Sequence, residues 1–389
     1  KKIAILGSTG SIGKSSINIL KKDKKNFEII LLTTNSNYKE LLKQVKDFKV
    51  RNIIINNLKN YLILKKKLKN KKINVFNNFD LFNKKFNSKI DLTISAISGL
   101  DGLKPTLDII QFSKKIAIAN KESIICAWNL IQKKIKKYKS EFIPIDSEHF
   151  SIRELLNEKK NNIEEVIITA SGGPFLNLPF KNFEKIKPKN AIKHPNWKMG
   201  SKISVDSATL MNKVFEVIEA QRIFNININK FKIYIHPKSY VHALIKFNNG
   251  LTKILVHDTS MTIPIFNIIY DKTDKSITSK KIDFSIINNL NFQEPNKIKF
   301  PSLKLLNKFS SKISLYDTVL VAANDELVYL FLKGQIKFTE ISIILKKILE
   351  LKEFSKYKQI IPTNYEQIYK LSRYVRLKTF SLSVLSQKC

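Results

Sequence analysis

The fold is decided at the N-terminus by the stretch Ile3-Ala4-Ile5-Leu6-Gly7-Ser8-Thr9-Gly10-Ser11-Ile12-Gly13. A short apolar strand runs into three glycines spaced three apart, and a helical period continues over residues 14–20. Glycines at such a turn let the backbone approach a pyrophosphate, and the helix start offers it unpaired N–H groups. The stretch predicts the first strand and helix of a dinucleotide-binding fold. An ordinary tight turn is the alternative.

The alternation of strand and helix continues to about residue 146. β-rich runs at 28–33, 52–55, 92–95, 116–119 and 142–145 are separated by segments of helical period. Such alternation is typical of a parallel, doubly wound sheet. We therefore expect a fold of the α/β class, with a Rossmann-like domain over residues 1–146.

The pattern changes at residue 147. Residues 147–271 contain a strand at 166–169, a helical run at 206–221 and two strands, 241–247 and 251–256, around a hairpin turn. They predict a central α+β domain. The polar segment 272–300 is expected to connect it to a C-terminal helical bundle over residues 301–389.

The chain is strongly basic, with 69 Lys and Arg against 32 Asp and Glu among 389 residues, a net charge of +37. The lysines are spread over the whole chain, whereas a nucleic-acid-binding protein needs a clustered basic face. No apolar run reaches the roughly 18 residues of a membrane span, and two cysteines form no disulfide framework. We expect a cytoplasmic protein of a bacterium. A plastid-type organelle is the alternative if a leader was removed, because the chain starts at Lys1.

The second strand ends in Thr33-Thr34-Asn35-Ser36-Asn37, without a carboxylate. NAD enzymes usually place Asp or Glu there for the ribose hydroxyls, whereas small polar residues can face a 2′-phosphate. The segment favours NADPH over NADH.

Two carboxylates, Asp146 and Glu148, stand two residues apart where the last strand of the first domain ends. Alternate residues of an extended segment point the same way, and carboxylates suit Mg²⁺ or Mn²⁺. Asn212, Lys213 and Glu216 share one face of the 206–221 run, so a third carboxylate is available. The alternative is two capped helices, with Asp206 or Ser207 capping the second.

Two loops carry further candidates. Ser171-Gly172-Gly173 can form a backbone nest for an anion, or only a turn. The segment 194–200 holds His194 and Trp197 between Pro and Gly, which suggests a lid, unless the Trp is a buried anchor. We interpret His236, His242 and His257 as structural, because their spacing fits no metal site.

The motifs GSTGSIG (7–13), ANKES (119–123), DSEH (146–149), SGGPF (171–175), HPNW (194–197), SVDSAT (204–209) and MNK (211–213) occur in this order. Together with AANDE (322–326) and FLKG (331–334), they make the chain resemble the 1-deoxy-D-xylulose 5-phosphate reductoisomerase family along its whole length.

This resemblance implies an oxidoreductase and isomerase of the non-mevalonate isoprenoid pathway. It would rearrange 1-deoxy-D-xylulose 5-phosphate and reduce the product to 2-C-methyl-D-erythritol 4-phosphate, with NADPH and Mg²⁺ or Mn²⁺. A homodimer, no nucleic-acid or membrane partner, and inhibition by fosmidomycin are also implied.

By matching motif positions, the resemblance places the metal on Asp146, Glu148 and Glu216. Direct roles in the reaction fall to Lys121, Glu148, His194 and Lys213. The substrate would contact Lys121, Ser147, Glu148, Ser171, His194, Trp197, Ser207, Asn212, Lys213 and Glu216. The coenzyme would contact Thr9, Gly10, Ser11, Ile12, Gly13, Asn35, Ser36, Asn37, Asn120, Glu122 and Gly200. Residues 194–200 would be the flap.

The chain departs from the family pattern at a few positions: Asn35, Lys198, Ser201 and Ser260. These concern the coenzyme's contacts and the flap. The competing interpretation is a plain NADP-dependent dehydrogenase of a phosphorylated sugar or semialdehyde, which would have no use for three metal-binding carboxylates.

Overall fold

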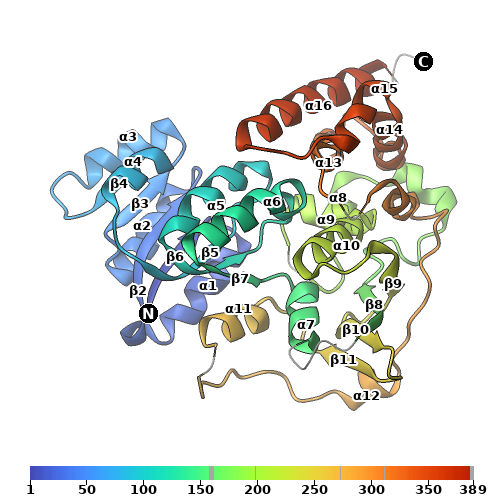
Figure 1. The fold of residues 1–389 in the computed structure, drawn as a ribbon, viewed down its shortest axis with the longest axis horizontal. Coiled ribbons are helices and arrows are strands. Elements are labelled where there is room, and N and C mark those ends of the chain that lie inside the picture. Colours follow the sequence, from blue (N-terminus) through green and yellow to red (C-terminus); the bar gives the residue numbers. More distant parts are fainter. Residues whose placement is uncertain (157–161, 198, 272, 311, 386–389) are drawn as a thin grey trace. The chain divides into compact units, whose positions relative to one another are not determined.

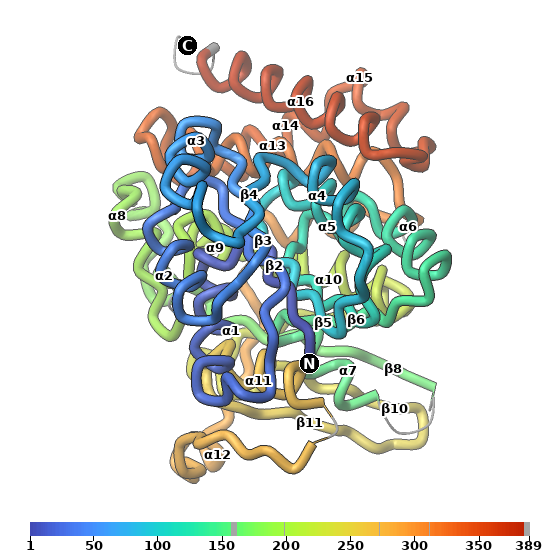
Figure 2. The backbone as a smooth tube through the Cα atoms, turned by 90° about the vertical axis from the view of Figure 1, so that its left-hand side faces the viewer, coloured from blue at the N-terminus to red at the C-terminus, as the bar shows by residue number. Residues whose placement is uncertain are grey.

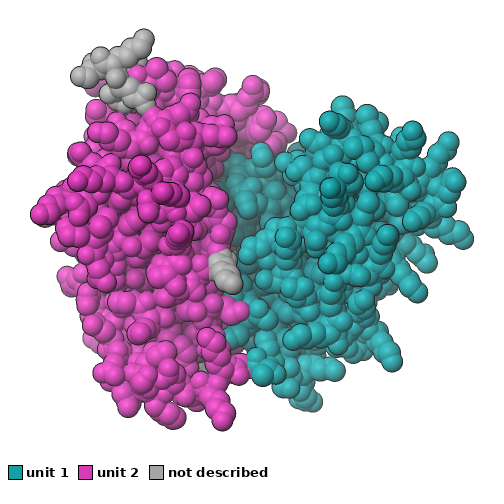
Figure 3. Space-filling view, turned by 180° about the vertical axis from the view of Figure 1, so that it is seen from behind, with its two compact units in different colours: residues 1–123, 130–146, 261–278 teal, residues 124–129, 147–260, 279–389 magenta. Residues whose placement is uncertain are grey.

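A computed structural model describes residues 1–156, 162–197, 199–271, 273–310 and 312–385. The chain forms two compact units (Figure 3). Unit 1 comprises residues 1–123, 130–146 and 261–278, and unit 2 comprises residues 124–129, 147–260 and 279–389. Lys198, which the sequence places in the flap, and the terminal residues 386–389 of the expected helical domain lie outside the described residues.

Unit 1 is built on a parallel sheet that, in the described residues, has seven strands in the order β4-β3-β2-β1-β5-β6-β7 (Figure 1). The strands are β1 (Lys2–Leu6), β2 (Glu28–Thr34), β3 (Asn52–Ile55), β4 (Asn74–Phe76), β5 (Ile90–Ser95), β6 (Ser113–Ile118) and β7 (Glu141–Pro144). The chain winds outward from β1 in both directions, so the predicted α/β, doubly wound fold is confirmed. The sequence analysis missed β4, which is only three residues long.

The helices of unit 1 connect these strands. They are α1 (Ser11–Lys21), α2 (Tyr38–Phe48), α3 (Leu58–Lys67), α4 (Phe79–Lys85), α5 (Leu103–Ile109) and α6 (Lys121–Tyr138), with α11 (Thr262–Ile269) added from later in the chain. Short 3₁₀ turns lie at Lys24–Asn26, Leu100–Gly102 and Ile110–Phe112. The helix expected between the predicted strands 92–95 and 116–119 is therefore α5, with the 3₁₀ turns on either side of it.

One apolar core joins α11 to the N-terminal sheet. Ile265, Ile268 and Ile269 of α11 are buried in the same cluster as Ile17 and Leu20 of α1. Residues 261–278 thus pack with the parallel sheet of unit 1. The sequence instead predicted that the central domain extends to residue 271. The sequence could not show this because α11 returns to the first unit only after the hairpin is complete.

Unit 2 contains a mixed sheet in the order β11-β10-β8-β9. Its strands are β8 (Ile163–Ala170), β9 (Phe231–Ile235), β10 (Val241–Phe247) and β11 (Thr252–Val256). β10 is antiparallel to β8 and β11, and β9 is parallel to β8. The expected hairpin of β10 and β11 is present, and α7 (Ser147–Leu156) packs on both strands.

The remaining helices of unit 2 lie around this sheet and in a C-terminal bundle (Figure 2). They are α8 (Pro188–Ala191), α9 (Ser201–Ala208), α10 (Met211–Phe224), α12 (Phe284–Asn288), α13 (Leu315–Leu332), α14 (Phe338–Glu350), α15 (Lys352–Ser355) and α16 (Tyr365–Leu385), with 3₁₀ segments at Phe180–Lys185, Ile228–Lys230, Pro301–Lys308 and Lys356–Gln359. The predicted C-terminal helices are present, but they group with the central sheet in one unit. Among the described residues, no helix is both long and apolar enough to cross a bilayer.

The helical run 206–221 is two helices, contrary to the sequence analysis. Leu210 lies between α9 and α10 with a left-handed φ of 58°. Asp206 and Ser207 are therefore in the last turn of α9 and do not cap the helix that carries Lys213. No glycine or proline marks this break, so no local signal predicts it.

Candidate active site

The glycines of the first turn have the conformations that a close-approach loop requires. Gly7 has φ +76°, and a Cβ on it would lie 2.6 Å from the carbonyl oxygen of Ala96. A Cβ on Gly13 would lie 2.4 Å from the Gly7 carbonyl oxygen, so only glycine lets α1 start so close to the turn. Gly10 precedes α1 without a side-chain cap, and Ser11 and Ile12 open its first turn. The N–H groups at this helix start are available to an anion.

The end of β2 supports this turn. The Gly7 N–H donates to Thr33 Oγ1 at 2.9 Å, and the Thr9 and Thr34 hydroxyls are 2.6 Å apart. Beyond them Asn35, Ser36 and Asn37 are exposed. The Asn37 side chain caps α2 by accepting the Glu40 N–H, so part of the predicted coenzyme segment also has a local structural role.

Asn120 and Glu122 stand at the start of α6. Asn120 is buried, caps α6 through the Ser123 N–H, and donates to the carbonyl oxygens of Ile97 and Gly99 at 2.5 and 2.7 Å. Its side chain therefore holds the loop after β5 in place. Glu122 is buried in the first turn of α6, and Gly200, the other outlying coenzyme candidate, is exposed at the start of α9 in unit 2.

The three predicted carboxylates converge. One oxygen from each of Asp146, Glu148 and Glu216 lies within 4.8 Å of the others. Asp146 follows the end of β7, Glu148 lies in the first turn of α7, and Glu216 lies on α10. Glu148 and Glu216 are buried. The three carboxylates thus come together, but not on the extended segment that the sequence predicted, because Glu148 lies in a helix. Their role as metal ligands stays a prediction.

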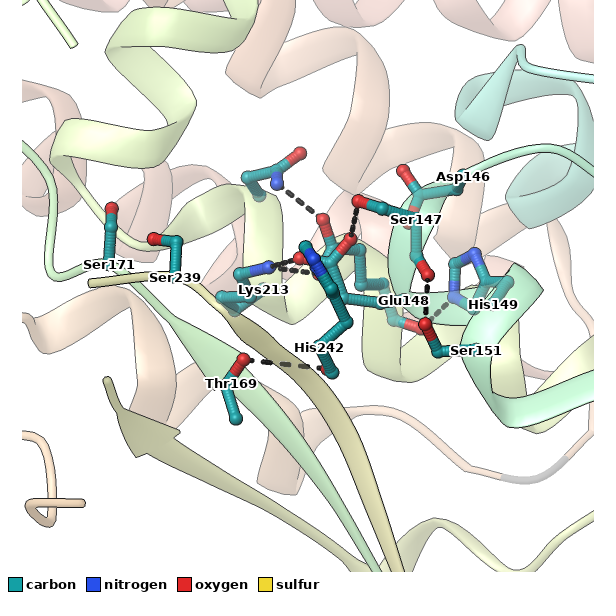
Figure 4. A network of polar contacts seen from close by, with 12 residues as sticks. Asp146, Ser147, Glu148, His149, Ser151, Thr169, Ser171, Lys213, Ser239 and His242 are labelled. Atoms are coloured by element: carbon teal, nitrogen blue, oxygen red, sulfur yellow. Dashed lines mark hydrogen bonds and ion pairs between the residues drawn. The ribbon is translucent and has the colours of Figure 1, made fainter. Parts of the chain in front are cut away.

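Lys213 binds two of these carboxylates (Figure 4). Its Nζ donates to Glu148 Oε1 and, at 2.6 Å, to Glu216 Oε2. Burial alone would lower the pKa of Lys213, but attraction to Glu148 and Glu216 outweighs it and raises the pKa above its ordinary value. Lys213 is therefore an ammonium cation at every pH of interest.

The remaining oxygens of these two glutamates are also hydrogen-bonded. Ser147 Oγ donates to Glu148 Oε2 at 2.5 Å, and Asn212 Nδ2 donates to Glu216 Oε1 at 2.5 Å. Asp146, in turn, forms an ion pair with Lys121 at the start of α6. Each carboxylate is thus oriented by a neighbour that the sequence analysis placed in the same site.

Ser171 and His194 form the second cluster of predicted residues. Their Oγ and Nε2 atoms are 3.0 Å apart, and Ser171 Oγ also accepts the Gly173 N–H. His194 Nδ1 accepts the N–H groups of Asn196 and Trp197 at 3.1 and 2.9 Å, so Nε2 carries the proton and donates to Ser171.

The charge state of His194 follows from its surroundings. Burial, with a further contribution from the Lys213 cation, lowers its pKa from 6.5 to about 4. The ring is neutral at neutral pH and organises the turn that carries Trp197, which is half-buried.

Ser207 meets the glycine loop. Gly172 and Gly173 have φ of +83° and +68°, and a Cβ on Gly173 would lie 2.9 Å from the Ser207 carbonyl oxygen. The loop after β8 therefore packs directly on the last turn of α9. Ser171, Ser207, Asn212 and Lys213 come from three segments of unit 2, as an anion site would need.

Two groups of supporting residues escaped the sequence analysis. His149 Nε2 is 2.9 Å from the backbone oxygen of Glu216, and its Nδ1 is 3.3 Å from Glu219 Oε2. Asp206, fully buried, accepts from Asn324 Nδ2 at 2.8 Å and pairs with Lys202. The sequence shows His149 in the DSEH segment and Asn324 in the AANDE segment of α13, but neither segment indicates which residue its side chain meets.

The donor atoms fit a divalent cation and a dinucleotide. Three carboxylates supply hard oxygen ligands, which Mg²⁺ and Mn²⁺ prefer. The ion pair of Lys213 with Glu148 shows that these carboxylates attract positive charge. The glycines of unit 1 let the turn pack tightly against its own backbone, and the helix start that follows offers N–H groups to a pyrophosphate.

Three family models match successive parts of the chain. Residues 3–128 match 1-deoxy-D-xylulose 5-phosphate reductoisomerase, residues 142–224 match its C-terminal domain, and residues 257–378 match the DXP reductoisomerase C-terminal domain.

Relatives of the same name align with nearly the whole chain. The protein of Pelagibacter ubique (strain HTCC1062) is 60% identical over 387 residues, 99% of this chain and 100% of that protein. The Sulfurihydrogenibium sp. (strain YO3AOP1) protein is 38% identical and covers 91% of this chain and 92% of its own.

Solved structures agree. A DOX-P reductoisomerase in complex with NADPH, fosmidomycin and magnesium superposes with a TM-score of 0.91 at 30% identity, covering 100% of this chain and 99% of that one. The Zymomonas mobilis enzyme in complex with NADPH gives 0.87 at 29% identity, covering 98% and 99%. With its glycine turn, its three converging carboxylates and relatives that match from end to end, the chain belongs to the 1-deoxy-D-xylulose 5-phosphate reductoisomerase family.

Proposed function

We propose that most of the NADPH contacts come from unit 1 and most of the contacts to 1-deoxy-D-xylulose 5-phosphate come from unit 2. Asp146, Glu148 and Glu216 hold Mg²⁺ or Mn²⁺. The chain then rearranges this sugar and reduces it to 2-C-methyl-D-erythritol 4-phosphate. The observation that carries the proposal is the convergence of the three carboxylates within 4.8 Å. A plain dehydrogenase would need the glycine turn alone.

The substrate's phosphate is assigned to Ser171, Ser207, Asn212 and Lys213. The first two offer hydroxyls, Asn212 an amide and Lys213 a buried cation, so the set supplies charge and directed hydrogen bonds together. Binding energy from this remote group positions the reacting carbons. Trp197, which follows directly on the His194 turn, is assigned to cover the bound substrate.

The substrate's hydroxyl and carbonyl oxygens are assigned to Ser147, Glu148, Lys213 and Glu216, with Lys121 beside Asp146. A divalent cation bound by the carboxylates supplies Lewis acidity, which polarises the carbonyl and stabilises negative charge on oxygen. In the metal-free chain Lys213 holds its proton, because Glu148 and Glu216 raise its pKa. His194 is neutral and donates through Nε2, so it acts as a hydrogen-bond donor to Ser171 and as the scaffold of the Trp197 turn.

NADPH is assigned to residues 9–13, Asn35, Ser36 and Asn37, Asn120, Glu122 and Gly200. Support comes from the tight glycine turn, from the helix start at Ser11 and from the absence of a carboxylate at residues 33–37. The exposed amides and hydroxyl of residues 35–37 can face a 2′-phosphate.

The experiment that tests the proposal follows NADPH oxidation by absorbance with 1-deoxy-D-xylulose 5-phosphate, with and without Mn²⁺. The wild type should require substrate and metal together. Glu216→Gln keeps the size of the side chain but removes a charged ligand, and it should lose activity by a factor of about 100 or more. Metal-independent turnover would instead support the plain dehydrogenase.

We also propose a cytoplasmic homodimer. The bacterial sources of the relatives support the compartment. For the dimer, support comes from β11, an edge strand of its sheet, where Ile254 and Val256 are 45% and 38% exposed and Leu251 just before it is 54% exposed. Analytical ultracentrifugation of the wild type should give twice the chain mass, and Ile254→Lys should shift it toward the monomer.

A further inference from the structure

Four aromatic rings of unit 2 form an unbroken series that begins on α7 and ends at Trp197. Phe150 and His257 are 6.4 Å apart, edge to face, and His257 stacks on His242 with centroids 3.7 Å apart and planes 20° apart. His242 meets Trp197 edge to face at 6.0 Å. Phe150 lies two residues after Glu148 on α7. The series therefore connects the helix that carries a metal carboxylate with the segment that carries Trp197.

The position of His242 is set by an irregularity of the hairpin. Val241 pairs with Val256 and Ala243 with Leu255, so His242 is the extra residue of a β-bulge. A bulge turns a side chain away from the direction that regular pairing would give it, and bulges recur beside active sites. Figure 4 draws His242 as part of the polar network that includes Lys213 and Glu148.

Hydrogen bonds hold the two imidazoles in this stack. His242 Nε2 donates to the backbone oxygen of His257 at 3.1 Å, and His257 Nδ1 donates to the backbone oxygen of Asp258 at 2.7 Å. The His257 N–H donates to the Tyr240 oxygen at 3.1 Å, so its backbone is fixed as well. Only 8% of His257 is exposed, and its Nε2 has no hydrogen-bond partner among the described residues. The contribution of the His257 side chain is therefore the packing of its ring against His242.

We infer that His257 is a positioning residue for the reaction. Its ring packs on the ring of His242, and His242 in turn fixes the position of Trp197 over the substrate. This inference rests on the proposed role of Trp197. Without the His257 ring, one face of His242 would lose its packing partner, and the ring would be held less firmly against Trp197, although its Nε2 hydrogen bond to the backbone would remain.

The charge state agrees with a packing role. Burial lowers the pKa of His257, although its hydrogen bond to Asp258 and the charge of Glu148 act in the opposite direction. The ring is thus neutral at neutral pH, and a neutral ring can stack on His242 without charge repulsion.

The test uses three variants in a Trp128→Phe background, so that Trp197 is the single tryptophan of the chain. His257→Ala removes the ring, and His257→Phe keeps a flat ring without the nitrogen atoms. Phe309→Ala is the matched control, because it also removes one of two facing buried rings, Phe309 and Tyr316, 5.4 Å apart. The readouts are Trp197 emission without substrate, and KM and kcat for 1-deoxy-D-xylulose 5-phosphate.

In His257→Ala we expect the Trp197 emission to move to longer wavelength, because the indole gains solvent contact. We expect KM to rise roughly two- to tenfold, the worth of one aromatic pair. The value of kcat should change less than about twofold, since the contact is made equally in the ground and transition states. His257→Phe should restore both emission and KM, and Phe309→Ala should change neither.

Unchanged emission in folded His257→Ala would overturn the inference, as would equal changes in His257→Ala and Phe309→Ala. A shifted emission with unchanged KM would overturn the role in the reaction. Trp197→Phe separates that case from a failure of the proposed function: if it also leaves KM unchanged, Trp197 does not cover the substrate.

Discussion

A single side chain, Lys213, compensates the charge of two of the converging carboxylates. Its ammonium contacts both Glu148 and Glu216, and all three side chains are at most 11% exposed. Two buried carboxylates this close together repel each other unless a cation lies between them. Lys213 therefore compensates the charge of these two carboxylates in the metal-free chain, and the proposed function also assigns it to the phosphorylated substrate.

Lys213→Met should destabilise the metal-free protein by about 3 kcal/mol, because it leaves buried carboxylates without their partner. Urea denaturation at neutral pH without divalent metal measures this change. The matched control is Lys232→Met, which breaks an ion pair with Glu165 whose lysine is 55% exposed and should leave the free energy of unfolding nearly unchanged. Equal stability of Lys213→Met and wild type would show that the ion pairs do not balance the cluster.

His194 should make the protein sensitive to acid. Its pKa is about 4 in the folded chain against an ordinary 6.5, so the unfolded chain binds the proton more readily. The free energy of unfolding therefore has its full value above pH 6.5, and it decreases as the pH falls from 6.5 toward 4. Urea denaturation of wild type and His194→Asn at several pH values checks it. The slope of unfolding free energy against pH should be smaller in the variant, and identical slopes would contradict the assignment.

At the scale of elements, the candidate phosphate site depends on how closely the loop after β8 approaches the end of α9. Gly173 makes this approach possible, since its φ is +68° and a Cβ would lie 2.9 Å from the Ser207 oxygen and 3.0 Å from Ala208 Cα. Backbone atoms, unlike the end of a long side chain, cannot move away cheaply. The position of Ser171 relative to Ser207 is therefore set by the size of residue 173.

Gly173→Ala should raise KM for the phosphorylated substrate about tenfold or more and should also destabilise the protein, because the loop must move away from α9. Steady-state kinetics and thermal unfolding measure the two effects. Gly250→Ala is the control, since Gly250 has a similar φ of +84° but open space around its Cβ. It should cost about 1 kcal/mol of strain and leave KM unchanged. A normal KM in Gly173→Ala would place the phosphate elsewhere.

The elements that the sequence predicted are those with local signals. The strands of unit 1 are continuous apolar runs between helical segments, and Asp146 and Glu148 follow the last of them directly. The break at Leu210 had no signal, because the left-handed residue is an ordinary leucine fixed by its buried surroundings. The bulge at His242 was equally hidden, since it depends on the pairing of β10 with β11. Local pattern thus predicted the carboxylates that converge, whereas tertiary packing decides which residues support them.

At the scale of the whole molecule, the net charge of +37 bears on binding rather than on folding. Most lysines lie on solvated surfaces, and exposed ion pairs such as Lys246 with Glu164 offset few of them. The proposed substrate and NADPH are both anions. A positive field around the whole chain attracts both of them before any specific contact forms.

We therefore expect kcat/KM to fall as the salt concentration rises while kcat stays constant. Screening weakens the long-range attraction between the chain and its anionic ligands but not the contacts of the bound ligands. The screening length shortens from about 30 Å at 0.01 M to about 8 Å at 0.15 M ionic strength. A decrease of about threefold to tenfold over that range is expected for an association step assisted by charge. Kinetics in potassium chloride, with sucrose added separately to vary viscosity, check it. If kcat/KM responds neither to salt nor to viscosity, association does not limit the reaction, and the excess of lysine has no part in capturing the substrate.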